Sequence, residues 1–165
     1  MSPEDAEVFT AKMETHYAAV GKVASNWAAF EHRIQWAIWN IAKLDYLTGA
    51  CITAQIGNSG RMIDALIALL RLKRATDDSI APLRKFAEKV GKKQRQRNRI
   101  VHDPWSFSIP SGEAARDELS ANREVISTLV PHSTKEVEAF ADDIVALVTE
   151  LDVQLKGVTF PPSPA

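Results

Sequence analysis

The sequence is poor in the residues that would place it outside the cell or in a membrane. It has one cysteine, Cys51, so an internal disulfide is impossible. No hydrophobic run approaches the roughly 20 residues that a transmembrane helix needs. The opening residues, MSPEDAEVFT, are acidic and lack the basic-then-apolar order of a signal peptide. We therefore expect a cytoplasmic protein with no membrane association.

Metal ligands are equally sparse. The four histidines are far apart in the sequence, and none stands at metal-ligand spacing from a carboxylate or a thiol. They are His16, His32, His102 and His132. The sequence thus predicts no metal site and no cofactor.

What the sequence does contain is helical periodicity. Apolar residues recur at three- and four-residue steps from Val23 to Ile41, which is typical of one face of a helix. We predict a long helix over residues 3–44 that Gly21 breaks or bends. Further helices are expected over 61–75, 75–102 and 133–155.

Their expected ends come from local signals. Ser59 is a candidate N-cap for the second helix, and Ser133-x-x-Glu136 is a capping box for the last. Pro104 should end the third, since the residue before a proline avoids helical geometry.

The segment after that stop is the least helical. SFSI (106–109) and EVISTLV (124–130) read as short strands, while a helix remains open for 112–124. We predict an all-α, up-and-down bundle of four to five helices with an irregular or β insertion at about 105–131. Residues 1–156 would form a single domain, followed by a disordered Pro-rich tail over 157–165.

A second aromatic stripe lies off the main apolar face of the first helix. It consists of His32, Trp36 and Trp39. A helix with two apolar faces is buried on two sides, so this stripe either packs inside the domain or forms a subunit interface.

Positive charge is concentrated in one short segment, although the formal net charge is only −1. Eight basic residues against one acid, Glu88, lie between residues 84 and 99; they are Arg84, Lys85, Lys89, Lys92, Lys93, Arg95, Arg97 and Arg99. Such asymmetry indicates either a solvated helix face or a local anionic partner.

On a helical wheel this basic segment divides. Lys92, Arg95 and Arg99 share an outer face suited to backbone phosphates, whereas Arg97 lies on the apolar stripe. An inward arginine needs an acid or a cleft, and Glu31 is a candidate partner in a supporting ion pair. His102 lies in the last turn, either as a C-terminal cap or hydrogen-bonded to Asn98 one turn earlier.

Arg97, Asn98 and His102 together suit phosphoryl chemistry. A histidine can move a proton near neutral pH, and an arginine can stabilise charge developing on a phosphate. Without a metal, RNA cleavage by the substrate's own 2′-OH is the simplest such reaction. Arg97 and His102 diverge by about 140° on an ideal helix, so one helix makes a poor site. Two copies across a two-fold axis would supply a complete one.

These residues also carry a family resemblance. RNRIVH, Arg97 to His102, resembles the R-N-x3-H form of the Arg-x4–6-His motif of HEPN domains. The late position of this helix, the WAAFEHRI pattern in the first helix and the tryptophan after the motif are also similar. The resemblance covers most of the chain from Val20 to Leu155 and is weakest in the insertion.

The resemblance implies a helical homodimer whose two motif helices share a cleft. Many HEPN proteins are metal-independent endoribonucleases that leave a 2′,3′-cyclic phosphate and a 5′-OH, and many act as toxins or in antiviral defence. By this resemblance His102 is the acid–base or phosphate-orienting residue, Arg97 the phosphate and transition-state ligand, and Asn98 a polar helper. RNA is then the partner, with an antitoxin or defence-system protein as a further candidate.

The chain departs from that pattern at one position. Toxins paired with small nucleotidyltransferase antitoxins often carry a tyrosine two residues after the histidine, where this chain has Pro104. Other HEPN proteins are inactive scaffolds. A non-catalytic interaction module and an RNA-binding module without cleavage therefore stand as alternatives.

Overall fold

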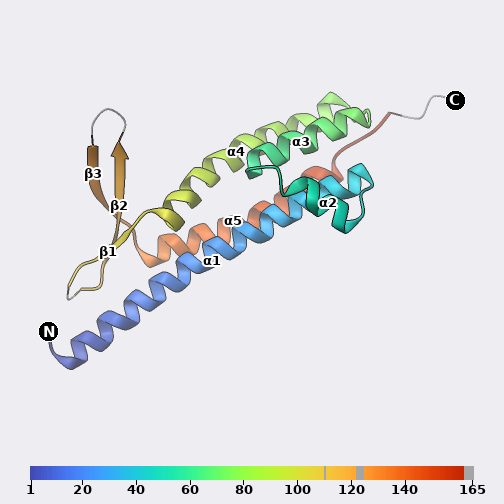
Figure 1. The fold of residues 1–165 in the computed structure, drawn as a ribbon. Helices are drawn as coiled ribbons and strands as arrows, with labels where there is room; N and C mark the ends of the chain where they lie inside the picture. The colour runs from blue at the N-terminus through green and yellow to red at the C-terminus, as the bar shows by residue number, and fades with distance from the viewer. Residues whose placement is uncertain (110, 122–124, 162–165) are drawn as a thin grey trace. The chain divides into compact units, whose positions relative to one another are not determined.

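The computed structural model describes residues 1–109, 111–121 and 125–161 and is mostly helical (Figure 1). The helices are α1 (Pro3–Ala42), α2 (Tyr46–Thr53), α3 (Ser59–Leu72), α4 (Asp77–His102) and α5 (Thr134–Lys156). The strands are β1 (Trp105–Phe107), β2 (Ala114–Ala121) and β3 (Val125–Pro131). The predicted helical fold is confirmed at this level, with the strands inside the segment expected to be irregular or β.

The contacts divide the chain into two compact units, and α1, α4 and α5 each contribute to both. The first unit comprises Met1–Trp27 and Arg95–Ile144. The second comprises Ala28–Gln94 and the described residues from Val145 on. The motif residues Arg97, Asn98 and His102 belong to the first unit, whereas the aromatic stripe of α1 belongs to the second.

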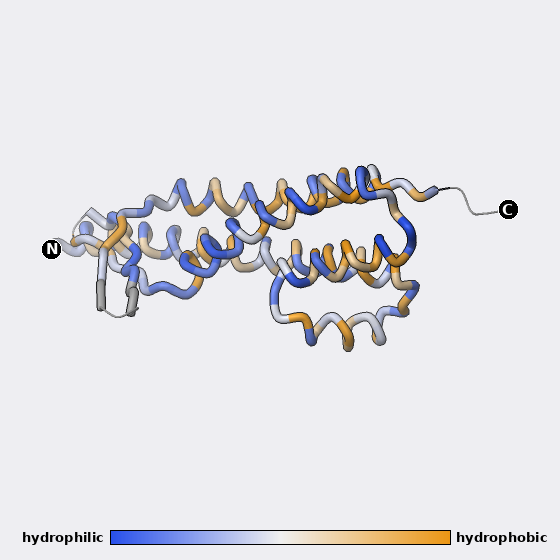
Figure 2. The backbone as a smooth tube through the Cα atoms, turned by 90° about the horizontal axis from the view of Figure 1, so that it is seen from above, coloured by the Kyte–Doolittle hydropathy of each residue, from blue (hydrophilic) through white to orange (hydrophobic). Residues whose placement is uncertain are grey.

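The second unit has the larger apolar core. Its buried side chains come from α1, α3, α4 and α5, and include Phe30, Ile34, Ile63, Leu66, Leu83, Phe86, Val90 and Leu151. Polar and apolar positions alternate around these helices, as the hydropathy colouring shows (Figure 2). Two ion pairs join neighbouring helices at the surface, Arg33 with Asp152 and Lys89 with Glu150, each at 2.5 Å. Such exposed pairs contribute little, so apolar burial dominates the stability of this unit.

Helix α2 covers Trp39 of α1. Trp39 is only 3% exposed, and its indole nitrogen donates to Thr53 Oγ1 at 3.2 Å. Tyr46 meets the same ring edge to face, with centroids 5.4 Å apart. A Cβ added to Gly49 would lie 2.5 Å from the Trp39 ring, so only glycine permits this close approach.

The first unit joins the start of α1 and the start of α5 to the sheet. Its buried residues include His16, Ala19, Val23, Ile100, Val137 and Phe140. Asn26 donates from Nδ2 to the Ala141 carbonyl at 3.0 Å, a tie between α1 and α5. The apolar face predicted for α1 is confirmed from Val23 to Ile38, since Val23, Trp27, Phe30, Ile34 and Ile38 are all buried, whereas Ile41 at its end is half-buried.

The sheet is a three-stranded antiparallel meander in the order β1-β2-β3. Trp105 lies opposite Arg116, and the β2–β3 ladder runs from Ala115 with Pro131 to Ala121 with Val125. Both predicted strands are present. The alternative of a helix at 112–124 is wrong as far as the segment is described, because 114–121 is a strand. Residues 122–124 lie outside the described residues.

One interior position and one helix end differ from expectation, and one predicted cap is confirmed. Helix α1 runs past Gly21 without a break, and a Cβ at Gly21 would meet nothing within 4 Å. The N-cap of α3 is Asn58 instead of Ser59, because Asn58 Oδ1 accepts from Arg61 N at 2.9 Å. The capping box of α5 is confirmed by hydrogen bonds between Ser133 and Glu136 in both directions.

At the other end of the chain, the predicted disordered tail lies partly outside the described residues, at 162–165. Before it, the carbonyl of Thr159 accepts from the backbone of Thr76 at 3.0 Å. None of the helices in the described residues combines the length and the hydrophobicity that spanning a bilayer requires.

We predict that Gly49→Ala lowers the free energy of unfolding by about 1–3 kcal/mol, because the new methyl group would overlap the Trp39 ring. Gly91→Ala is the matched control, since a Cβ there meets nothing within 4 Å; it should stabilise α4 by up to about 1 kcal/mol. Urea denaturation of the two variants measures both effects. Equal stability of the two variants would contradict the close packing of α2 on Trp39.

Candidate functional site

The motif residues lie at the C-terminal end of α4, where two features stop the helix at His102. Pro104 follows directly and cannot continue it. The Trp105 indole nitrogen donates to the Ile100 carbonyl at 3.0 Å and so satisfies a carbonyl that the helix end would leave free. The position predicted for His102, in the last turn, is confirmed.

Arg97 and Asn98 are joined to each other. Arg97 is half-buried, as its place on the apolar stripe predicted, and donates from Nη1 to Asn98 Oδ1 at 3.0 Å. Its Nε is buried and has no hydrogen-bond partner. Of the two readings of His102, the hydrogen bond to Asn98 is absent from the described residues; Asn98 accepts from Arg97 instead. Within the described chain the exposed His102 ring makes no hydrogen bond of its own and is open to a substrate.

The predicted outer basic residues are exposed, but they are not equivalent. Arg95 and Arg99 belong to the first unit and Lys92 to the second. Arg99 Nη1 lies 2.5 Å from Glu118 Oε2 and is therefore already paired with an acid on β2. Lys92 and Arg95 form no ion pair within the described part of the chain, so they remain available to backbone phosphates.

A charged cluster on β2, which the sequence reasoning missed, joins the sheet to the end of α4. Arg116 is 6% exposed and lies between two acids. Its Nη2 donates to Glu118 Oε1, and its Nε is 3.4 Å from Asp103 Oδ2, close enough for an ion pair but not aligned for a hydrogen bond. Arg116 and Glu118, two positions apart on a strand, share one face. That alternation was the available signal for the Arg116–Glu118 pair, whereas Asp103 and Arg99 come from the end of α4 and the residue after it.

The state of Glu118 follows from these contacts. Partial burial raises the pKa of its carboxyl, but the hydrogen bonds and positive charges of Arg99 and Arg116 outweigh that effect. The pKa of Glu118 therefore lies below its usual value. Glu118 is thus a carboxylate at neutral pH, held between two guanidinium groups.

Glu31, the candidate ion-pair partner of Arg97, belongs to the second unit. Its carboxylate accepts a hydrogen bond from Ser59 Oγ at 2.6 Å, and this bond ties α1 to the buried start of α3. Because Glu31 and Arg97 lie in different units, their pairing stays a prediction.

Helix α2 covers only part of the aromatic stripe of α1. Trp39 lies under α2, whereas Trp36 is 42% exposed and His32 is exposed. The indole of Trp36 donates to His32 Nε2 at 2.9 Å, and the three rings meet at centroid distances of 5.6 to 6.3 Å. A partner could thus contact His32 and Trp36 but not Trp39.

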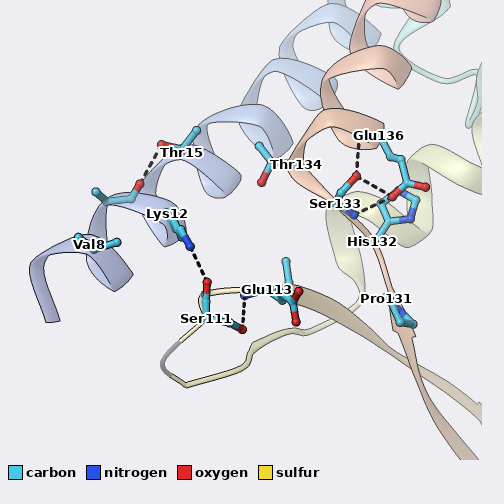
Figure 3. A pocket seen from close by; sticks show the side chains of 13 residues that line it. Val8, Lys12, Thr15, Ser111, Glu113, Pro131, His132, Ser133, Thr134 and Glu136 are labelled. Carbon is cyan, nitrogen blue, oxygen red and sulfur yellow. Dashed lines mark hydrogen bonds between the residues drawn. The ribbon is translucent and has the colours of Figure 1, made fainter. Parts of the chain in front are cut away.

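The first unit also contains a pocket of about 840 Å³ that the sequence did not indicate (Figure 3). Its walls are the start of α1, the β1–β2 turn, the end of β3 and the start of α5. Lys12 points from α1 across the pocket and donates from Nζ to the Ser111 carbonyl at 2.7 Å. His132 and Thr134 line the opposite side. The volume is within the range of small-molecule sites, about 300–1,000 Å³.

One histidine, His132, lines this pocket, and a second, His16, contacts the lining residue Thr134. His16 is 1% exposed and its Nδ1 is 3.0 Å from Thr134 Oγ1. Its ring meets Trp105 at 4.3 Å and Phe107 at 5.5 Å, both edge to face. Burial lowers the pKa of His16, and the charge of His132 adds to this. Burial also lowers the pKa of His132. Both rings are therefore neutral near pH 7, and both have a buried Nε2 without a hydrogen-bond partner.

Within the described residues, no group of three or more potential metal ligands comes together. Comparison of the chain with protein-family models, with curated proteins and with solved structures finds no match in any of the three.

We predict that the free energy of unfolding falls as the pH drops from 7.5 to 5.5. In the unfolded chain a histidine has a pKa of about 6.5, so the unfolded state gains protons in this window that the folded state refuses at His16 and His132. His16→Phe should reduce this loss, and urea midpoints at the two pH values measure it. His32→Ala, at an exposed position, is the control. A His16→Phe variant with the parent's full pH dependence would contradict the argument.

Proposed function

We propose that the protein is a metal-independent endoribonuclease with a composite active site, built from Arg97, Asn98 and His102 of two copies. The same proposal includes a HEPN-like arrangement of the helices, as the resemblance of RNRIVH implies. A role as a toxin or antiviral effector belongs to this proposal as well.

One observation supports it most: within the described residues, the only side-chain hydrogen bond of the three motif residues is the one between Arg97 and Asn98, and none of the three forms an ion pair. His102 is exposed and makes no hydrogen bond in the described residues. The bond of Arg97 is to the neutral amide of Asn98, so its positive charge is not neutralised there. A purely structural arginine at a half-buried position is expected to pair with an acid.

The chemistry assigns each residue a task. His102 of one copy takes the proton from the 2′-OH, whose oxygen attacks the adjacent phosphorus and displaces the 5′ oxygen. His102 of the second copy gives a proton to that leaving oxygen. Arg97 stabilises the extra negative charge on the phosphoryl oxygens in the transition state. The products are a 2′,3′-cyclic phosphate and a 5′-OH.

A dimer is needed for geometric reasons. Arg97 and His102 are five residues apart on a continuous helix and project about 140° from one another. A single copy therefore cannot direct both at one phosphate, whereas two helix ends related by a two-fold axis can. The exposed Arg95 and Lys92 would attract the RNA backbone.

We predict that the protein cleaves single-stranded RNA in the presence of EDTA and that His102→Ala lowers the rate by at least about 100-fold. Arg97→Ala should also lower the rate strongly, because it removes the charge that stabilises the transition state. Gln96→Ala, an exposed neighbour on the same helix, should cleave as the parent does. Gel analysis of end-labelled RNA measures the rate and identifies the cyclic phosphate.

Two results would overturn the proposal. One is cleavage that persists in His102→Ala; the other is RNA that is bound by the parent but never cleaved. The second result would favour the alternative of an RNA-binding module.

A further inference from the structure

We propose that Arg99 and Arg116 form a phosphate-binding site that Glu118 occupies in the free protein and that an RNA phosphate takes over on binding. This inference rests on the proposed function, because it assigns the RNA chain a contact beside His102. It joins Arg99 of α4 to Arg116 and Glu118, two residues of β2 that the motif does not contain.

The geometry is that of an occupied anion site. The two oxygens of one carboxylate are divided between two arginines: Glu118 Oε2 is 2.5 Å from Arg99 Nη1, and Oε1 accepts from Arg116 Nη2. A phosphodiester also presents two charged oxygens, and paired guanidinium groups are a preferred partner for such a group. Glu118 thus places a negative charge where the two arginines could hold a phosphate.

The exchange is feasible because each arginine has an alternative to Glu118, an acid for Arg116 and water for Arg99. Arg116, whose side chain is only 7% exposed, keeps Asp103 at its Nε when Glu118 leaves. Arg99 is 57% exposed and can be solvated during the exchange. Releasing Glu118 from the exposed Arg99 costs little, whereas its bond to the buried Arg116 must be replaced by the phosphate as Glu118 leaves. The buried arginine is therefore never left without a counter-charge.

The position links this site to the proposed chemistry. Arg99 precedes His102 by three residues and Asp103 follows it directly. A phosphate held by Arg99 and Arg116 would therefore lie at the same helix end as the His102 ring. Glu118 would then weaken RNA binding until a phosphate competes successfully for both arginines.

The test measures binding separately from cleavage. The full chain and its variants are titrated with a fluorescent 2′-O-methyl RNA oligonucleotide, which lacks the attacking 2′-OH. Glu118→Gln removes the competing charge and should tighten binding at low salt by about fivefold. Glu14→Gln is the matched control. Glu14 is exposed on α1, and its substitution removes the same charge from the first unit. It should change the affinity by less than about twofold.

A second comparison shows whether the gain acts through the two arginines. Adding Arg99→Ala to Glu118→Gln should abolish the gain. It should also make the negative slope of log affinity against log salt shallower by about one. Arg116→Lys, which keeps a charge but loses the fork of donors, should also bind more weakly than the parent. Thermal unfolding confirms that each variant is folded. Equal affinities for Glu118→Gln and Glu14→Gln, or a gain that survives Arg99→Ala, would overturn the inference.

The experiments distinguish a failure of the phosphate site from a failure of the ribonuclease proposal. If Glu118→Gln tightens binding while unmodified RNA is never cleaved, the phosphate site stands and the ribonuclease proposal fails. If RNA is cleaved in a His102-dependent way and Glu118→Gln gains nothing, the reverse holds.

Discussion

The buried guanidinium of Arg116 is the constraint on which the candidate site depends. A charge that is 6% exposed must be matched by acids, and here they are Asp103 at the end of α4 and Glu118 on the same strand. Because Asp103 follows His102 directly, satisfying Arg116 also fixes the backbone where the motif ends. The sheet thereby determines the position of the motif, although it contributes none of the motif residues.

The tryptophan after the motif is a second link between the sheet and the end of α4. Trp105 lies opposite Arg116 in the sheet, donates to the Ile100 carbonyl and packs against the buried His16. One side chain thus connects the end of α4, the first strand and α1. His16 stays neutral in this apolar setting, because protonation would place a charge between aromatic rings without a counter-ion. The same burial that organises this unit makes its stability sensitive to acid.

The sequence was informative where the physics is local. Apolar periodicity identified the buried face of α1, Ser133 and Glu136 identified the start of α5, and Pro104 identified the end of α4. Gly21 and Asn58 show the limit of such signals. A helix tolerates a glycine when the residues before and after it in the sequence are packed, and two neighbouring polar residues, Asn58 and Ser59, compete for one cap position. For 114–121 the choice between helix and strand depended on β3 and β1, and a single segment does not contain that information.

The site was predictable only in part for the same reason. The wheel placed Arg97 on the inner side and Lys92, Arg95 and Arg99 outside, because those positions depend on one helix. It could not show that Arg99 is paired with Glu118, a residue 19 positions away on a strand. This pairing changes the electrostatic argument, because a basic residue with a bound carboxylate is not a free phosphate ligand. The attraction of this helix end for RNA depends on the competition between that carboxylate and a phosphate, and net charge along the sequence says little about it.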